Sequence, residues 1–345
     1  MVEVPRVPAC RAAVVTRGPA SAVPLTWWTP ESTDDRGAHL EWCGAVGPAV
    51  IVTPASGSVS MPRIDDIVIV SWNTHVGGGD IRALVRDLRS GRWTEGQGTE
   101  HFILLLQEVF RQGPEVPSAP AGPAGSAIRP AQGSSPRMDV VWTAETLGLH
   151  LFYAPSMRNG ASDPGMAPED RGNAILSTMP LRDVRVIERP FERQRRVAVA
   201  ARVEVAAPSG SAMALLLVSA HLDTRGTTRR GYVLGPPART RQMRGLLDAL
   251  PGDAAAVMGG DLNTWFGDAE GAYGAARRSF PQTPAGGGAT SGRMRLDYLF
   301  FRLPMDLHAR WRVLPDEFGS DHQPVLGVIR PRAETRRPER TGSKP

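Results

Sequence analysis

The sequence predicts an α/β protein in which β-sheets pack against each other and helices cover their outer faces. Many apolar runs of strand length follow one another along the chain. Some are joined by helical patterns and others by hairpin-length links, which favours packed sheets with helices outside. The 345 residues are 41% hydrophobic, enough for a sizeable core. No apolar run approaches the roughly 18 residues that span a bilayer, so we expect no stable membrane insertion.

The N-terminal half begins with an extension of unclear structure at residues 1–60. A main domain is predicted over residues 61–330, and its first strand covers residues 67–73. Apolar residues recur at helical spacing between 80 and 90, which predicts an amphipathic helix capped near Asp80. The next strand covers 102–108 and ends in a carboxylate.

Further strands and two helices follow. The strands are predicted at 150–154, 171–177, 197–206, 213–218, 254–263, 295–301, 307–314 and 325–329. One helix carries an apolar stripe from 243 to 250, and a short one is predicted near 269–277. Residues 113–137 are rich in Pro, Gly, Ala and Ser, which predicts a flexible insertion in the domain. Residues 331–345 predict a disordered basic tail.

The net charge of +5 and the pI of about 9.8 come almost entirely from arginine, since the one lysine is Lys344. Arginine binds phosphate oxygens well, but the base composition of the genome explains its abundance equally well. Cys10 and Cys43 do not make a disulfide framework, and we expect no redox role for them. The compartment stays open: cytoplasmic by default, exported if the natural start lies upstream.

Polar side chains of one kind recur where predicted strands end. They are Asn73, Glu108, His221, the pair Asp261 and Asn263, and Asp297 with Asp321 and His322. A single such residue is usually a packed or turn residue. Five strand ends that all present Asp, Glu, Asn or His are hard to explain by packing, so we expect them to meet in one pocket.

Asp261 and Asn263 follow an apolar strand that ends in Gly259 and Gly260. Residues two apart on a strand share a face, so both side chains point the same way. A carboxylate beside an amide suits a metal-bound phosphate, because the acid binds a cation or water and the amide donates to oxygen.

The ordered set of motifs resembles the endonuclease/exonuclease/phosphatase superfamily, whose fold is that of DNase I. The motifs are Ser71-Trp72-Asn73, Leu106-Gln107-Glu108, Gly172-Asn173-Ala174-Ile175-Leu176-Ser177, Ser219-Ala220-His221, Gly260-Asp261-Leu262-Asn263, Leu296-Asp297-Tyr298 and Gly319-Ser320-Asp321-His322-Gln323-Pro324-Val325. They span about residues 62 to 330. The resemblance implies a four-layer α/β/β/α sandwich of two packed mixed sheets. It also implies hydrolysis of phosphate esters with a divalent metal, usually Mg²⁺, with Mn²⁺ as a second option.

The resemblance also implies residue roles. Glu108, Asn73 and Asp321 would hold the metal, since hard cations prefer oxygen ligands. His322 would take a proton from the attacking water or, if protonated, stabilise the phosphate, and Asp297 would orient its imidazole. In the family the residue matching Asp261 positions or deprotonates the water, so the general base is either Asp261 or His322.

Four further residues are expected to touch the substrate. Asn263 would hold a phosphate oxygen, His221 would donate to the same phosphate, and Asn173 and Arg171 are weaker candidates. His75 and His221 depart from the pattern of the DNA-repair branch, which disfavours repair of abasic sites.

The expected substrate is a phosphodiester, with nucleic acid first. Arginines at 189, 193, 195 and 196 and between 225 and 241 could grip a polyanion. The alternatives are a phospholipid (sphingomyelinase-like) phosphodiesterase, a phosphomonoesterase and, from another class, a non-catalytic binding module that keeps the fold. We expect a monomer.

Overall fold

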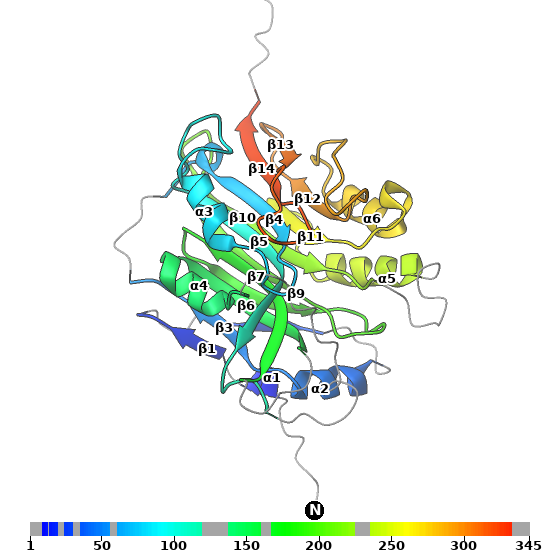
Figure 1. Cartoon of the computed structure of the whole chain (residues 1–345). Coiled ribbons are helices and arrows are strands. Elements are labelled where there is room, and N and C mark those ends of the chain that lie inside the picture. The colour runs from blue at the N-terminus through cyan, green and yellow to red at the C-terminus, as the bar shows by residue number, and fades with distance from the viewer. Residues whose placement is uncertain are drawn as a thin grey trace, which may run out of the picture.

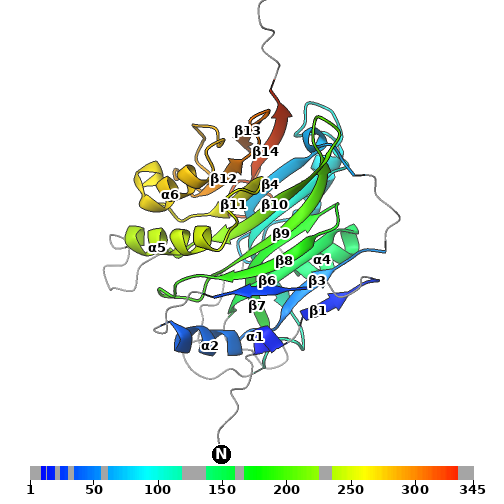
Figure 2. The same cartoon turned by 180° about the vertical axis from the view of Figure 1, so that it is seen from behind.

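A computed structural model describes residues 9–12, 14–19, 24–29, 35–55, 61–118, 137–159, 167–224 and 235–332. Two mixed β-sheets pack face to face, and helices lie on the outer face of each sheet (Figure 1; Figure 2). This is the predicted four-layer α/β/β/α sandwich, and the fold class is confirmed.

The larger sheet has eight strands. Their order is β1 (Val14–Arg17), β3 (Ala49–Val52), β6 (His150–Arg158), β7 (Glu169–Ser177), β5 (Phe102–Gln112), β4 (Val68–Asn73), β14 (Val325–Pro331) and β13 (Leu307–Val313). The smaller sheet has six. Their order is β12 (Asp297–Arg302), β11 (Ala256–Asp261), β10 (Ala212–His221), β9 (Val197–Ala206), β8 (Arg182–Glu188) and β2 (Thr26–Trp28).

Helices α3 (Ile81–Arg89) and α4 (Val140–Leu147) cover the eight-stranded sheet, and α5 (Gly235–Asp248) and α6 (Gly271–Ser279) cover the six-stranded sheet (Figure 1). Asp80 caps α3 as predicted, since its carboxylate accepts a hydrogen bond from the Ala83 amide. Helices α1 (Ala9–Ala12) and α2 (Arg36–Gly44) lie at the bottom of the view. In the described residues, short 3₁₀ turns cover Ile64–Asp66 and Gly267–Ala269.

Strand β9 shows how the sequence builds the layers. Val197, Val199, Val203 and their neighbours at every second position lie in the core between the sheets. Ala198 and Ala200 point the other way, into the apolar layer under α5 and α6. Because side chains alternate along a strand, one apolar run supplies two layers, which explains why a strand buried on both faces lacks polar alternation.

The first 60 residues contribute strands to both sheets. Strand β3 pairs with β6, β1 pairs with β3, and β2 pairs with β8. These strands therefore continue the sheets of the main domain, so residue 61 does not mark an edge of either sheet. Of the predicted insertion and tail, residues 119–136 and 333–345 lie outside the described residues.

The cysteines differ from expectation, because Cys10 and Cys43 form a disulfide that ties α1 to α2. Both are buried. Within the described parts of the chain, no helix has the length and apolar character needed to cross a membrane.

The two sheets approach each other closely at Gly259, next to the strand ends that carry the predicted site residues. A Cβ atom on Gly259 would lie 2.7 Å from the Cβ of Ser71 in the opposite sheet. A larger residue at 259 would push β11 away from β4, so glycine here brings the ends of these two strands together.

Candidate active site

Three predicted site residues lie in one row across the six-stranded sheet. His221 is the register partner of Asp261 on the neighbouring strand, and Asp261 is the partner of Asp297 on the next. All three are buried. The strand register therefore places an imidazole and two carboxylates side by side at the adjacent ends of β10, β11 and β12.

The opposite sheet reaches the same place through Asn73. Its amide Nδ2 donates a hydrogen bond of 2.9 Å to Oδ2 of Asp261, while Oδ1 of Asp261 accepts from the Asn263 backbone amide at 2.8 Å. Both carboxylate oxygens of Asp261 thus face donors. Burial and the neighbouring Asp297 carboxylate raise the pKa of Asp261 to about 7.

His322 forms the predicted pair with Asp297. Its Nδ1 lies 2.6 Å from Oδ2 of Asp297, and its Nε2 lies 4.0 Å from Oδ2 of Asp261 and 3.9 Å from Oδ1 of Asp321. Burial alone would lower the pKa of His322, but the three carboxylates raise it to about 10. His322 is therefore an imidazolium at neutral pH.

His221 is held in a different electrostatic environment. Its Nδ1 lies 3.1 Å from Nη1 of Arg196, and its Nε2 lies 2.9 Å from Nδ2 of Asn263. Burial and then the nearby cations, Arg196 first, lower the pKa of His221 well below its usual value. The two histidines of the site therefore differ in charge at neutral pH.

Glu108 does not end its strand as predicted, because β5 continues to Gln112. The pairing of β5 with β7 is irregular between Leu106 and Val109, and Glu108 has a φ of 51°. Such a bulge redirects a side chain. The carboxylate of Glu108 lies 3.8 Å from Nδ1 of His221, so the bulge brings it into the site.

Asp321 lies at the exposed rim and pairs with His75. Its Oδ1 is 2.9 Å from Nδ1 of His75, and its side chain is 56% exposed. The hydrogen bond that His75 donates to Asp321 raises the pKa of His75, and the pair with His75 holds the pKa of Asp321 below its usual value despite partial burial. A cation at Asp321 would therefore compete with His75.

The two weaker candidates differ from each other. The amide of Asn173 donates to the Val197 carbonyl at 2.7 Å, a bond between the sheets, so this donor is used in the fold. Arg171 is half-buried, and among the described residues its guanidinium hydrogen-bonds only the Met157 sulfur. Burial lowers the pKa of Arg171 and the Glu108 carboxylate opposes this shift, so Glu108 is the acid that acts on its charge.

Most of the arginines expected to grip a polyanion are structural. Arg195 pairs with Glu188, Arg239 with Glu270 and Arg241 with Glu192, while Arg189 donates to backbone carbonyls. Arg193 is exposed, and residues 225–234 lie outside the described residues. Arg189, Arg195 and Arg239 are buried through these contacts, whereas the Arg241 side chain stays 57% exposed beside its acid.

Two residues support the site in ways that the sequence did not predict: Arg196 was expected only to grip a polyanion, and Asp223 was given no role. Arg196 contacts His221 directly, and Asp223 accepts from the Nε of Arg196 at 3.2 Å. The available signal was Asp223 itself, since a carboxylate two residues after a strand-end histidine lies close to that histidine.

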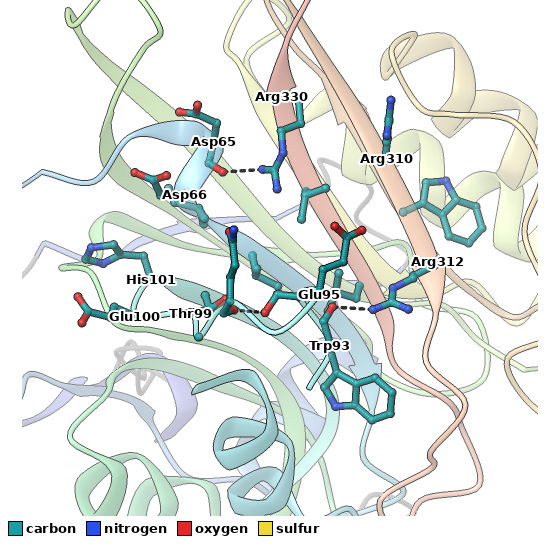
Figure 3. Close-up of a pocket in the computed structure, with 18 residues that line it drawn as sticks. Asp65, Asp66, Trp93, Glu95, Thr99, Glu100, His101, Arg310, Arg312 and Arg330 are labelled. Carbon is teal, nitrogen blue, oxygen red and sulfur yellow. Dashed lines mark hydrogen bonds between the residues drawn. The ribbon is translucent and has the colours of Figure 1, made fainter. Parts of the chain in front are cut away.

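A cavity of about 850 Å³ lies elsewhere, at the far ends of β4 and β14 (Figure 3). Acidic residues such as Asp65 and Glu100 line it together with Arg310 and Arg330, and Arg330 donates to the Asp65 carbonyl. None of the predicted site residues lines this cavity. The chemistry is therefore assigned from the converging side chains and not from cavity size.

The residues present fit a divalent cation. Among the described residues, no group donates a hydrogen bond to the partly exposed Glu108 carboxylate, and Oδ1 of Asp297 is buried without a partner. Carboxylate oxygens of Asp261 and Asp297 also lie within 4.8 Å of each other, which adds negative charge to the site. Oxygen ligands and excess acid are what Mg²⁺ or Mn²⁺ requires.

Comparisons with known proteins agree with this fold. The model of the Endonuclease/Exonuclease/phosphatase family matches residues 70–322. An endonuclease/exonuclease/phosphatase structure from Beutenbergia cavernae DSM 12333 is 21% identical, with a TM-score of 0.52 over 76% of this chain and 71% of that chain. Sphingomyelinase C from Streptomyces griseocarneus is 16% identical, with a TM-score of 0.42 over 79% and 99%. A comparison with curated proteins found no match.

The four-layer fold and the cluster of acids, amides and imidazoles define the class of protein as a metal-dependent phosphoesterase. Because the family model covers most of the chain, this protein belongs to the Endonuclease/Exonuclease/phosphatase family.

Proposed function

We propose that this protein is a phosphodiesterase, and in particular a nuclease, that uses Mg²⁺. The observation that carries the proposal is the meeting of Asn73, Asp261 and His322, which come from distant parts of the sequence, around one buried point. A binding module without catalysis has no need for a carboxylate and an imidazolium held 4.0 Å apart.

The metal would be held by Glu108 and Asn73, with Asp321 as a ligand or as a partner of metal-bound water. When bound, such an ion supplies positive charge to the nonbridging oxygens and the leaving group of a phosphate ester. Mn²⁺ offers the same chemistry with similar ligands.

Asp261 is the better candidate for the general base. Its pKa of about 7 leaves much of it ionised at neutral pH, whereas His322, with a pKa of about 10, has no free lone pair to offer. In this assignment Asp261 takes a proton from water, and the His322 imidazolium stabilises charge on the phosphoryl group. Asp297 fixes the ring by accepting from Nδ1.

Phosphate oxygens would be held by Asn263, His221 and Arg171. Asn263 and His221 are buried donors beside Asp261, and Arg171 brings a positive charge on the side of Glu108. Fixed donors that face a developing negative charge are a large part of catalysis in water-poor sites.

A second cavity supports a nucleic-acid substrate. It has a volume of about 750 Å³ and is bordered by Gly78, which touches the active-site loop at His75. Trp142, 49% exposed, also lines it, and the guanidinium of Arg82 stacks over its ring at 5.9 Å. A cation over an exposed aromatic suits a nucleotide, since the ring stacks on a base and the cation attracts phosphate.

A phospholipid phosphodiesterase is the second candidate, favoured by a different observation. Trp265 and Phe266 stand two and three residues after Asn263 and are 36% and 60% exposed. Exposed aromatics beside a reaction site also suit an apolar leaving group or a lipid surface.

A substrate panel tests the proposal. Plasmid, single-stranded DNA, RNA, a chromogenic phosphodiester and monoester, and sphingomyelin are each incubated with Mg²⁺, Mn²⁺ or EDTA. We expect nucleic acid and the chromogenic diester to be cleaved with either metal and EDTA to stop cleavage. His322→Ala should be inactive and His308→Ala, on β13, unaffected. Cleavage of sphingomyelin alone would select the second candidate, and no cleavage of any substrate would select the binding module.

A further inference from the structure

The imidazole of His221 lies between two hydrogen-bond donors. On one side Nη1 of Arg196 is 3.1 Å from Nδ1, and on the other Nδ2 of Asn263 is 2.9 Å from Nε2. A neutral imidazole has only one nitrogen that can accept a hydrogen bond, and an imidazolium has none. Only one of the two groups can therefore donate a hydrogen bond to the ring.

Arg196 must be the donor, because it cannot accept a hydrogen bond. A guanidinium carries only N–H donors and stays protonated, so Nδ1 of His221 must offer it a lone pair. The amide of Asn263 can turn, which exchanges its oxygen for its nitrogen. In its present orientation Nδ2 also donates to the Leu222 carbonyl at 3.0 Å, and turning would give up that bond.

Arg196 is fixed by its own partners. Its Nε donates to Oδ1 of Asp223 at 3.2 Å, and Gln242 on α5 brackets Asp223. The Gln242 oxygen accepts from the Asp223 backbone amide at 2.9 Å, and the Gln242 amide donates to Oδ2 of Asp223 at 3.2 Å. Arg196, Asp223 and Gln242 are all buried, so these three side chains cannot exchange their hydrogen bonds for bonds to water.

We infer that Arg196 is a positioning residue that holds His221 as the tautomer with its proton on Nε2. The Nε2–H then points toward Asn263 and toward Oδ2 of Asp261, which is 3.5 Å away. This is the place where the proposed function puts the substrate phosphate, and the role assigned to the Nε2–H rests on that function. His221 is thereby made a donor to a phosphate oxygen and prevented from acting as a base at this nitrogen.

The proton on Nε2 of His221 also determines the orientation of the Asn263 amide. Once Nε2 of His221 carries the proton, the Asn263 oxygen is the atom that can accept from it. The Asn263 NH₂ group is then turned away from the ring, where it can donate to a second phosphate oxygen. The hydrogen bonds run in one direction, from Arg196 through His221 and Asn263 to the substrate.

Long-range ¹H–¹⁵N correlation spectra of the full chain labelled at histidine nitrogens test the tautomer without any activity assay. The chain has seven histidines, and His221→Gln identifies the signals of interest. We expect a non-protonated ¹⁵N shift at Nδ1 and a protonated shift at Nε2 in the wild type at neutral pH. The reverse pattern, or two protonated nitrogens, overturns the inference, and this wild-type result does not depend on the folding of any variant.

Variants then test the cause. Arg196→Met removes the donor at similar length, Arg196→Lys keeps a donor, and Arg244→Met alters an exposed arginine on α5 as the control. We expect Arg196→Met to mix the two tautomers and to lower kcat by about 10- to 100-fold with little change in KM, the usual cost of losing a group that orients a functional histidine. Arg196→Lys should restore the Nε2–H tautomer, and Arg244→Met should match the wild type.

The outcomes separate this inference from the proposed function. A folded Arg196→Met protein with an unchanged His221 spectrum would overturn the positioning role even in an active phosphodiesterase. The expected spectra in a protein that cleaves no phosphate ester would support the role of Arg196 and overturn the proposed function instead.

Discussion

Asn73 and Asp261 belong to opposite sheets, yet the Asn73 amide donates to the Asp261 carboxylate across 2.9 Å. They are 188 residues apart in the chain. Gly259 makes the approach possible, because any side chain there would collide with Ser71. The site therefore lies where the two sheets of the sandwich meet.

The pair of His322 and Asp297 predicts a pKa change. The Asp297 carboxylate favours the imidazolium, so Asp297→Asn should lower the pKa of His322 from about 10. NMR titration of the metal-free protein measures it directly, with Asp316→Asn, an acid at the surface, as the control.

The same pair makes stability depend on pH. The pKa of His322 is raised in the folded state, so its protonated form adds to the free energy of unfolding. This contribution is fully present below the pKa of the unfolded chain, about 6.5, and is lost as pH rises toward about 10. In Asp297→Asn this loss should shrink. An equal loss of unfolding free energy in the wild type and in Asp297→Asn would mean that Asp297 does not raise the pKa of His322.

Removal of Glu108 predicts weaker metal binding. Mg²⁺ at about 100 times its Kd should stabilise the wild type by roughly 2.7 kcal/mol. Glu108→Gln should need far more Mg²⁺ for the same rise in Tm, while Glu100→Gln, exposed and distant, should behave as the wild type. Equal Mg²⁺ titrations of Tm in Glu108→Gln and the wild type would remove Glu108 from the metal site.

The buried pair of Arg239 and Glu270 holds the turn after Asn263. Both side chains are almost fully buried, and Glu270 also accepts from the Phe266 amide at 3.1 Å. Glu270→Gln leaves a buried cation unpaired and should cost about 3–5 kcal/mol of unfolding free energy in urea denaturation. The exposed carboxylate of Asp268 pairs with Arg295, and Asp268→Asn should cost less than about 1 kcal/mol. Similar losses in the two variants would contradict the assignment.

The disulfide between Cys10 and Cys43 predicts sensitivity to reductants. It joins residues 33 positions apart, and cross-links of that length contribute about 3–4 kcal/mol in the chain-entropy model. Reduction or Cys43→Ser should lower the unfolding free energy by that amount. We propose on this basis that the chain folds in an oxidising compartment. Identical unfolding midpoints with and without reductant would argue against both statements.

Much of the fold could be predicted from the sequence, because local patterns decide it. The strand before Asn73, the helix capped by Asp80 and the strand before Asp261 each follow from apolar runs and their end residues. Helix α4 and strand β8 were missed. Residues 140–147 lack a clear polar face, and β8 begins with exposed charged residues, so neither shows a clear period.

Less of the site could be predicted, because contacts between distant residues decide it. The set of strand-end polar residues was visible, but the bulge that turns Glu108 and the partner of the Asn173 amide depend on tertiary pairing. For the same reason, arginines that looked available for a polyanion proved to be buried partners of acids such as Glu188 and Glu270.

The most direct test compares hydrolysis of a chromogenic phosphodiester by the wild type and by Asp261→Asn in Mg²⁺, with Tm measured on both. We expect the wild type to hydrolyse the ester, EDTA to stop hydrolysis, and Asp261→Asn to lose about 10²–10⁴ in kcat while remaining folded. A folded Asp261→Asn protein that hydrolyses the ester at the wild-type rate would contradict the central claim.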